Sequence, residues 1–175
     1  QSALRKLGKG AHSPVLPIKY TCENGTVLDT RARIRFVREK DGSVGVMFSP
    51  QIYKADLSRF SDAEKKQLEN GDPVFGSMPG SNGAMTEVVF QIDSDTNQVM
   101  FVPKAVIVSN IALLKDKYRL NPAEQNCLLN GHPLTIYLND KPKTMGIDLN
   151  DDNGVRIEDN EEEEWRESSR REWSK

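Results

Sequence analysis

Apolar residues recur at every second position in several short stretches of the chain, which is the spacing of a strand with one buried face. The clearest case runs from Thr86 through Val88 and Phe90 to Ile92. Asn-Gly, Asp-Gly and proline-containing segments separate these stretches, as turns do. The pattern predicts strands at 15–20, 30–37, 44–48, 74–78, 86–92, 98–102, 134–138, 145–149 and 155–157.

A fifteen-residue segment occurs twice, without a gap, at a spacing of 60 residues. The copies span 60–74 and 120–134, and the same Asn-Gly-x-Pro sequence lies near the end of each. Because the identities fall at positions that start helices, end them or fill cores, we interpret the match as a structural repeat. The identical pairs are Ala63/Ala123, Glu64/Glu124, Leu68/Leu128, Asn70/Asn130, Gly71/Gly131 and Pro73/Pro133.

Each copy carries the start and stop signals of a helix of about two turns. Ser61 and Asn121 are good N-cap residues, and each is followed three residues later by a glutamate, which is the spacing of a capping box. Gly71 and Gly131 supply the left-handed backbone that commonly ends a helix. A helix this short is marginal alone, so we expect packing against the following strands to hold it.

The elements after each helix complete a unit of one helix and three strands. A loop is predicted at 139–142, and we expect Phe90 and Ile147 to face equivalent cores. The predicted fold class is therefore α+β, with tandem helix-plus-antiparallel-hairpin (α-β-β-β) repeats, two clear and one degenerate, and a C-terminal acidic helix. The predicted segments are a degenerate first repeat (1–48), a connector (49–59), a second repeat (60–102), a connector helix (103–119), a third repeat (120–157) and an acidic tryptophan-containing tail (158–175).

The first repeat matches the others less closely. Leu7 and Gly10 take the places of the leucine and glycine that end the later helices, and Pro14 that of their proline. Its helix would need residues before Gln1, so we expect the chain to be a fragment of a longer protein. The connector helix is predicted to place on one face Ile111, Leu114 and Tyr118.

The repeats resemble those of a known family. The pattern is Leu-x-x-x-Gln/Glu, Leu-x-x-Gly-x-Pro-Val, followed by a hairpin that ends in an apolar strand. It resembles the repeats of uncharacterised proteins encoded on conjugative elements of gut bacteria, over 60–102 and 120–157 and more weakly over 4–48. That family is classed as a domain of unknown function. The resemblance implies a cytoplasmic setting and the company of mobile-element proteins, and it implies no chemistry.

Composition is that of a globular chain, with 37% hydrophobic and 29% charged residues among 175. No apolar run approaches the ~20 residues of a membrane span, and two cysteines make no disulfide framework, so we expect a cytoplasmic protein without membrane contact. The net charge of −2 is uneven: 151–175 carries −5 and 1–150 carries +3. Neither value is that of a dedicated nucleic-acid binder.

Residues suited to catalysis or metal binding do not combine into a recognisable site. His12 and His132 lie in turn-like segments without an orienting partner, and Cys127 lies on the apolar side of its helix. The acidic segment 148–159 starts like a calcium loop, but Asn153 stands where that loop needs glycine. A hairpin turn explains it without a metal, and we expect neither an enzyme nor a cofactor.

An arginine stripe is the main candidate for binding an anionic partner. Arg31, Arg33 and Arg35 alternate with apolar residues, so a strand would place three guanidinium groups on one face and bury the other. Arg38 extends the charge. The alternatives are a solvated sheet face and a contact with phosphate groups or an acidic partner.

The tail carries both tryptophans, Trp165 and Trp173, eight residues apart and so roughly on one side of a helix. The helix could dock them on the repeats or lead into a further domain, or it could present them to a partner. Taken together, the sequence predicts a non-enzymatic interaction or scaffold module that binds a protein through the repeat surface. The alternative is a nucleic-acid-binding accessory protein of a mobile element that uses the arginine face.

Overall fold

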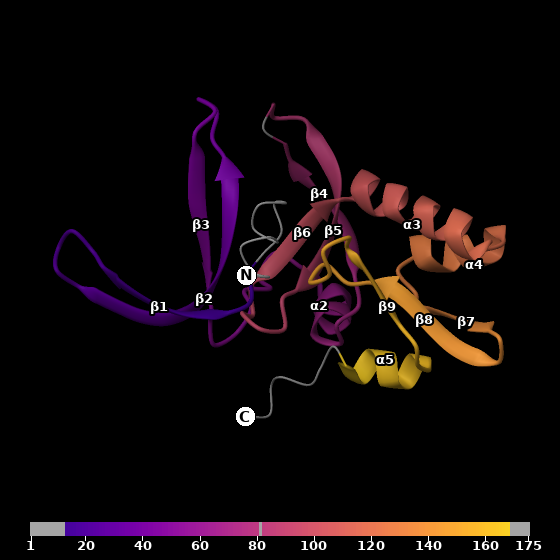
Figure 1. Cartoon of the computed structure of the whole chain (residues 1–175). Helices are drawn as coiled ribbons and strands as arrows, with labels where there is room; N and C mark the ends of the chain where they lie inside the picture. Colours follow the sequence, from indigo (N-terminus) through magenta and orange to yellow (C-terminus); the bar gives the residue numbers. More distant parts are fainter. Residues whose placement is uncertain (1–12, 81, 169–175) are drawn as a thin grey trace. The chain divides into compact units, whose positions relative to one another are not determined.

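The computed structural model describes residues 13–80 and 82–168, which form four helices and three small antiparallel sheets (Figure 1). The predicted α+β class is confirmed. The chain divides into two compact units. The N-terminal unit comprises residues up to 55 together with 94–98, and the C-terminal unit comprises 56–93 and the residues from 99 onwards.

The N-terminal unit contains one sheet built along a single long strand. Strand β2 (Val27–Arg38) pairs antiparallel with β1 (Leu16–Thr21) through its first half and with β3 (Val44–Pro50) through its second half. Ala32 alone is paired on both sides, so the sheet is two consecutive two-stranded hairpins (Figure 1). All three predicted strands of the first repeat are present. The helix expected before them lies outside the described residues.

The C-terminal unit begins with the second repeat. Helix α2 (Asp62–Glu69) precedes a sheet of β4 (Val74–Pro79), β5 (Met85–Ile92) and β6 (Val99–Pro103). Helix α3 (Lys104–Tyr118) follows directly and fills the predicted connector helix. Phe90 contacts Phe60 while the neighbouring Val89 packs with α3, so β5 is covered on both faces at these two positions.

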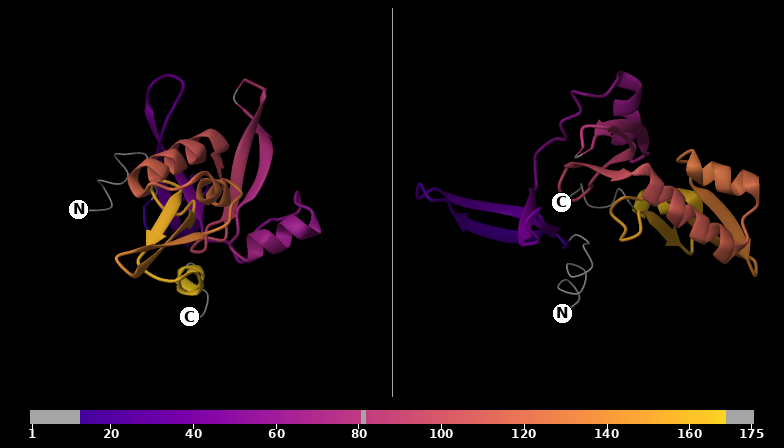
Figure 2. Two further views of the ribbon diagram at one scale, coloured as in Figure 1. Left: turned by 90° about the vertical axis from the view of Figure 1, so that its right-hand side faces the viewer. Right: turned by 90° about the horizontal axis from the view of Figure 1, so that it is seen from above.

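The third repeat has the same order of elements. Helix α4 (Pro122–Leu129) leads into β7 (Leu134–Leu138), β8 (Lys141–Ile147) and β9 (Val155–Glu158), and α5 (Glu162–Ser168) follows. Helices α3 and α4 lie side by side (Figures 1 and 2). The arrangement is consistent with the predicted repeat.

The predicted helix caps are confirmed in both copies. Ser61 and Asn121 each accept from the main-chain N–H three residues later, and each donates its own N–H to a glutamate oxygen at 2.8 Å. Gly71 and Gly131 lie just after the helices with φ of 83° and 84°. Both glycines therefore hold the left-handed backbone that the sequence pattern requires.

The main core joins the second and third repeats. The predicted face of α3 is confirmed, because Ile111 is fully buried and Leu114 and Tyr118 pack against the core. Ile107, one turn earlier, belongs to the same face. The buried cluster consists of Val89, Ile107, Ile111, Leu120, Leu128, Met145, Ile147, Leu149 and Val155.

Two details of the repeat differ from expectation. We expected Phe90 and Ile147 to be equivalent, but Phe90 pairs with Val74 whereas Met145 pairs with Leu134. The counterpart of Phe90 is therefore Met145, 55 residues later. The cause is the connection before β8, which we expected to extend to residue 142. It is a two-residue turn at 139–140 with positive φ at both positions, so β8 begins at Lys141.

Candidate functional site

The sheet of the N-terminal unit has one face made of large apolar side chains. Directly opposite residues of antiparallel strands lie on the same face, and the pairs Tyr20–Leu28 and Phe36–Val46 belong to it. These side chains remain between 36% and 65% exposed. We call the following set the apolar face: Leu16, Tyr20, Leu28, Phe36, Val44, Val46 and Phe48.

The exposure of this face contradicts the sequence prediction. We expected the side of β2 opposite the arginines to be buried, but only Ala32 is, at 1%. Ile34 is half-buried and Phe36 is 38% exposed. A contiguous exposed apolar surface on a folded domain marks a place where another surface binds. The signal was present in the sequence as alternating apolar residues in three successive strands.

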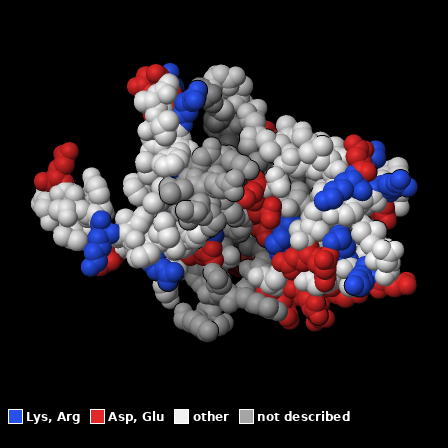
Figure 3. All heavy atoms as spheres, viewed as in Figure 1, with Lys and Arg blue, Asp and Glu red and all other residues white. Residues whose placement is uncertain are grey.

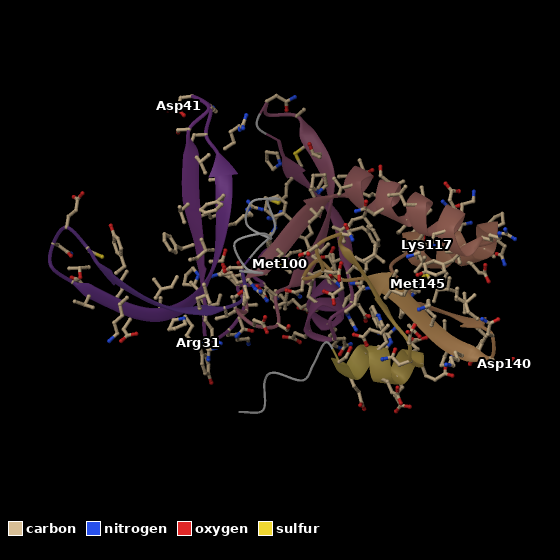
Figure 4. All side chains as sticks on the ribbon, viewed as in Figure 1. Arg31, Asp41, Met100, Lys117, Asp140 and Met145 are labelled. Atoms are coloured by element: carbon tan, nitrogen blue, oxygen red, sulfur yellow. The ribbon has the colours of Figure 1, made fainter. Side chains whose placement is uncertain are left out.

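The arginine stripe is not a continuous exposed surface. Arg33 forms an ion pair with Asp95 and also donates to the main-chain oxygen of Ser13 at 2.9 Å, so its charge is engaged within the unit. Arg31, labelled in Figure 4, is exposed. Arg38 is also exposed, but its even position places it on the opposite face of β2.

Arg35 is intermediate in exposure between Arg33 and the two exposed arginines. Its side chain is half-buried, and its Nη2 lies 3.8 Å from the sulfur of Met47, the residue directly opposite on β3. Its Nε is buried and has no hydrogen-bond partner among the described residues. The structure therefore separates the four predicted arginines into one that is internally paired, one that is half-buried and two that are exposed on opposite faces.

Charge is divided sharply between the two units. Counted over the sequence, the N-terminal unit carries ten basic and five acidic residues, and the C-terminal unit carries fourteen basic and twenty-one acidic ones. The net charges are +5 and −7. Acidic side chains gather over α5, whose first turn holds Glu162, Glu163 and Glu164 (Figure 3). The basic unit is also the one with the apolar face.

Trp165 is part of the packing of the C-terminal unit. Its side chain is 7% exposed, and the guanidinium of Arg156 lies 4.0 Å from the centre of its ring. A side-chain carbon on Gly146 would come within 2.7 Å of the ring, so this glycine makes room for it. This placement agrees with the alternative in which the helix docks on the repeats. Trp173 lies outside the described residues.

Arg156 ties the end of the third repeat to α5. It forms ion pairs with Asp148 at 2.7 Å and Glu158 at 2.6 Å, and it donates to the oxygen of Trp165 at 2.9 Å. Burial acts to raise the pKa of Glu158, but hydrogen bonds from Asn160 and Arg156 outweigh it and hold that pKa below its ordinary value. The carboxylate of Asp148 is thus used in an ion pair within a turn between two strands.

The remaining candidates from the sequence are two histidines and a cysteine. His132 is exposed in the turn before β7, and His12 lies outside the described residues. Burial, with a smaller contribution from the charge of Glu162, raises the pKa of the Cys127 thiol, which keeps it protonated and weakly nucleophilic at neutral pH. Over residues 13–80 and 82–168, no group of three or more metal-binding side chains is assembled. None of the helices described there is long and apolar enough to cross a membrane.

Comparison with known proteins gives one match. Residues 1–59 match a family described as a protein of unknown function (DUF4099). No curated protein and no solved structure matches the chain. The matched region covers the strands that carry the apolar face, whereas the resemblance drawn from the sequence is clearest over 60–102 and 120–157. The match confirms similarity to a domain of unknown function and assigns it no chemistry.

Proposed function

We propose that this protein is a non-enzymatic interaction module that binds a protein partner through the apolar face of its N-terminal unit. The observation that supports the proposal is the exposure of this face, with side chains such as Phe48 at 50% and Tyr20 at 55%. The sequence predicted that a protein partner binds the repeat surface, without naming a part of it. The sheet of the first repeat is the part of that surface on which large apolar side chains are gathered.

The architecture of the N-terminal unit gives a physical reason for a partner. A two-stranded hairpin is at best marginally stable in water, and this sheet is two such hairpins that share only Ala32. Burying the exposed half of a large apolar side chain stabilises by roughly 1 kcal/mol. Covering the seven residues of the apolar face would therefore contribute several kcal/mol to both binding and folding of this unit.

The test compares capture of partners by matched variants. A tagged protein is used to isolate binding proteins from its native host, and quantitative mass spectrometry compares the wild type with the double variant Tyr20→Ser/Phe36→Ser. The control is Tyr53→Ser, which removes an aromatic ring that is 99% exposed outside the apolar face. We expect a defined protein that the wild type and the control retain and the double variant loses. Identical sets from all three proteins would refute the proposal.

The finer features of the setting are also proposals. The resemblance to proteins of conjugative elements supports a role in the cytoplasm in the company of mobile-element proteins. Contact with nucleic acid is the alternative function, and the net charge of +5 on the N-terminal unit supports it. It would rest mainly on Arg31 and Arg38, because Arg33 is engaged with Asp95.

A further inference from the structure

Strand β3 is an edge of the sheet in the N-terminal unit, since the strand order is β1-β2-β3. The direction in which the main-chain groups of β3 point can be worked out from Ile34, which lies on the neighbouring strand β2. The N–H of Ile34 donates to Ser13 Oγ at 2.8 Å and its carbonyl accepts from the N–H of Ser13 at 2.9 Å, so both groups point away from β3. Because these directions alternate along a strand, the odd-numbered residues of β2 bond to β3.

The same alternation identifies the unpaired groups on β3. Gly45, Met47 and Ser49 lie opposite Val37, Arg35 and Arg33, so their main-chain groups point towards β2. The main-chain N–H and C=O groups that point outwards, where the described chain offers no further strand, belong to Val44, Val46 and Phe48.

This edge lacks the features that usually keep exposed strands from pairing. Natural edge strands carry lysine, an internal proline or a bulge, or are covered by another element. From Val44 to Ser49 the strand has no charged residue, and proline occurs only at its last position, Pro50. The side chains beside the unpaired groups belong to the apolar face, with Val46 at 48% and Phe48 at 50% exposed.

We propose that β3 accepts an extended segment of the partner protein as an additional strand, and that this segment alternates apolar residues with a central acidic residue. The inference rests on the proposed function and deepens it by naming the chemistry of the partner. Main-chain hydrogen bonds to Val44, Val46 and Phe48 would provide affinity, and side chains on alternate positions would provide specificity.

The acidic residue follows from the charges beside the edge. The guanidinium of Arg35 lies 3.8 Å from the sulfur of Met47, and Met47 is the residue of β3 beside which an added strand would place a side chain on the same face. The side chain of Arg35 is half-buried and forms no ion pair with a described residue, so a carboxylate beside its guanidinium would be favoured. Nearer the turn, Glu39 Oε1 lies over Gly45, where a side-chain carbon would come within 2.6 Å. An acid is therefore favoured opposite Met47 and disfavoured opposite Gly45.

These charges also argue against a second copy of the chain as the occupant. A symmetric antiparallel pairing of β3 with itself around Met47 would bring the two Arg35 guanidinium groups together. It would also join two units that each carry a net charge of +5. Like charges brought close together repel each other and would destabilise such a pairing.

The probe is a labelled seven-residue peptide, Val-Thr-Val-Glu-Val-Thr-Val, compared with the same peptide carrying lysine at the centre. Binding is measured by fluorescence anisotropy, and the exchange of individual amide protons is followed by NMR. In the free protein we expect the amides of Gly45 and Met47 to be protected and those of Val46 and Phe48 to exchange rapidly. Saturation with the glutamate peptide should slow exchange at Val46 and Phe48 by at least tenfold.

Four variants make the test specific. Val46→Pro removes an outward N–H without breaking a bond to β2, and it should weaken peptide binding more than tenfold. Thr21→Pro makes the same kind of change at the outer edge of β1, on an exposed residue, and should leave binding unchanged. Should Val46→Pro lose its circular dichroism signal, Val46→Lys places a charge on the edge instead. Arg35→Gln should abolish the preference for glutamate over lysine, which we expect to be about three- to tenfold.

Each contrary result overturns a stated part of the proposal. Unchanged exchange at Val46 and Phe48 with 1 mM peptide refutes strand addition. Equal binding of the two peptides refutes the acidic partner. Protection that appears on raising the protein concentration alone, together with a dimer in light scattering, makes a second copy the occupant. If Val46→Pro still captures a host protein that Tyr20→Ser/Phe36→Ser loses, the proposed function stands and strand addition is wrong.

Discussion

Replacing Gln91 with leucine should lower the free energy of unfolding by removing hydrogen bonds that join the second and third repeats. Gln91 is 5% exposed, and its Nε2 donates to the main-chain oxygens of Gly71 and Ile147, both at 3.0 Å. Its Oε1 accepts from the main-chain N–H of Leu149 at 2.8 Å. One side chain thus joins the turn after α2 to the end of β8. Leucine fills a similar volume, so the variant removes the hydrogen bonds and leaves little cavity.

The cost follows from the groups that lose their partner. A buried main-chain group without a hydrogen bond costs about 1–3 kcal/mol, and carbonyls tolerate this better than N–H groups do. Most of the loss therefore falls on the N–H of Leu149, with smaller contributions from the oxygens of Gly71 and Ile147. We expect Gln91→Leu to lower the free energy of unfolding by about 2–4 kcal/mol.

Urea unfolding measures this loss, with the fluorescence of the buried Trp165 as a signal from the C-terminal unit. The control is Gln67→Leu, which makes the same substitution at an exposed position on α2. The control should change the free energy of unfolding by less than about 0.5 kcal/mol. A loss for Gln91→Leu that is no larger than that of the control would refute the role given to this side chain.

Three further predictions concern other parts of the chain. Gly131→Ala should lower the melting temperature more than Gly71→Ala. Both variants place alanine at positive φ, but only at Gly131 would the new side-chain carbon meet another residue, at 2.8 Å. Equal shifts in melting temperature would contradict this prediction. The pKa of Glu158 is lowered from 4.5, so the stabilising contribution of its carboxylate is present above that pH and is lost as the pH falls. Glu158→Gln should therefore flatten the acid side of a plot of the free energy of unfolding against pH. An unchanged slope would contradict this prediction. If nucleic acid is a ligand, Arg31→Glu and Arg38→Glu should weaken an electrophoretic shift that also fades as salt rises, whereas no shift at low salt would exclude it.

Local patterns predicted the elements of the repeats well because their causes lie within a few residues. The capping boxes at Ser61 and Asn121 need only a glutamate three residues later, and both are present. The helix ends at Gly71 and Gly131 need only a residue that tolerates positive φ. The equivalence of strands between the repeats was predicted less well, because it depends on the length of the turn before β8. The pattern predicted this turn to be two residues longer than it is.

The candidate site could not be predicted in the same way. The burial of one face of β2 was inferred from alternation, which shows that a face is apolar but not that anything covers it. Arg33 looked like part of an exposed stripe because its partner, Asp95, lies 62 residues further along the chain. The position of Arg38 on the other face follows from its even number, which strand alternation shows directly.

The sequence by itself determined which segments form helices and strands, the α+β class, and which residues share a face of each strand, because caps, turns and alternation act over neighbouring residues. Only the tertiary structure decided which of those faces are covered. Val89 and Phe90 on opposite faces of β5 are both buried, whereas the apolar face of the N-terminal unit is open. Burial depends on contacts between segments far apart in the chain, and no local pattern encodes whether such a contact exists.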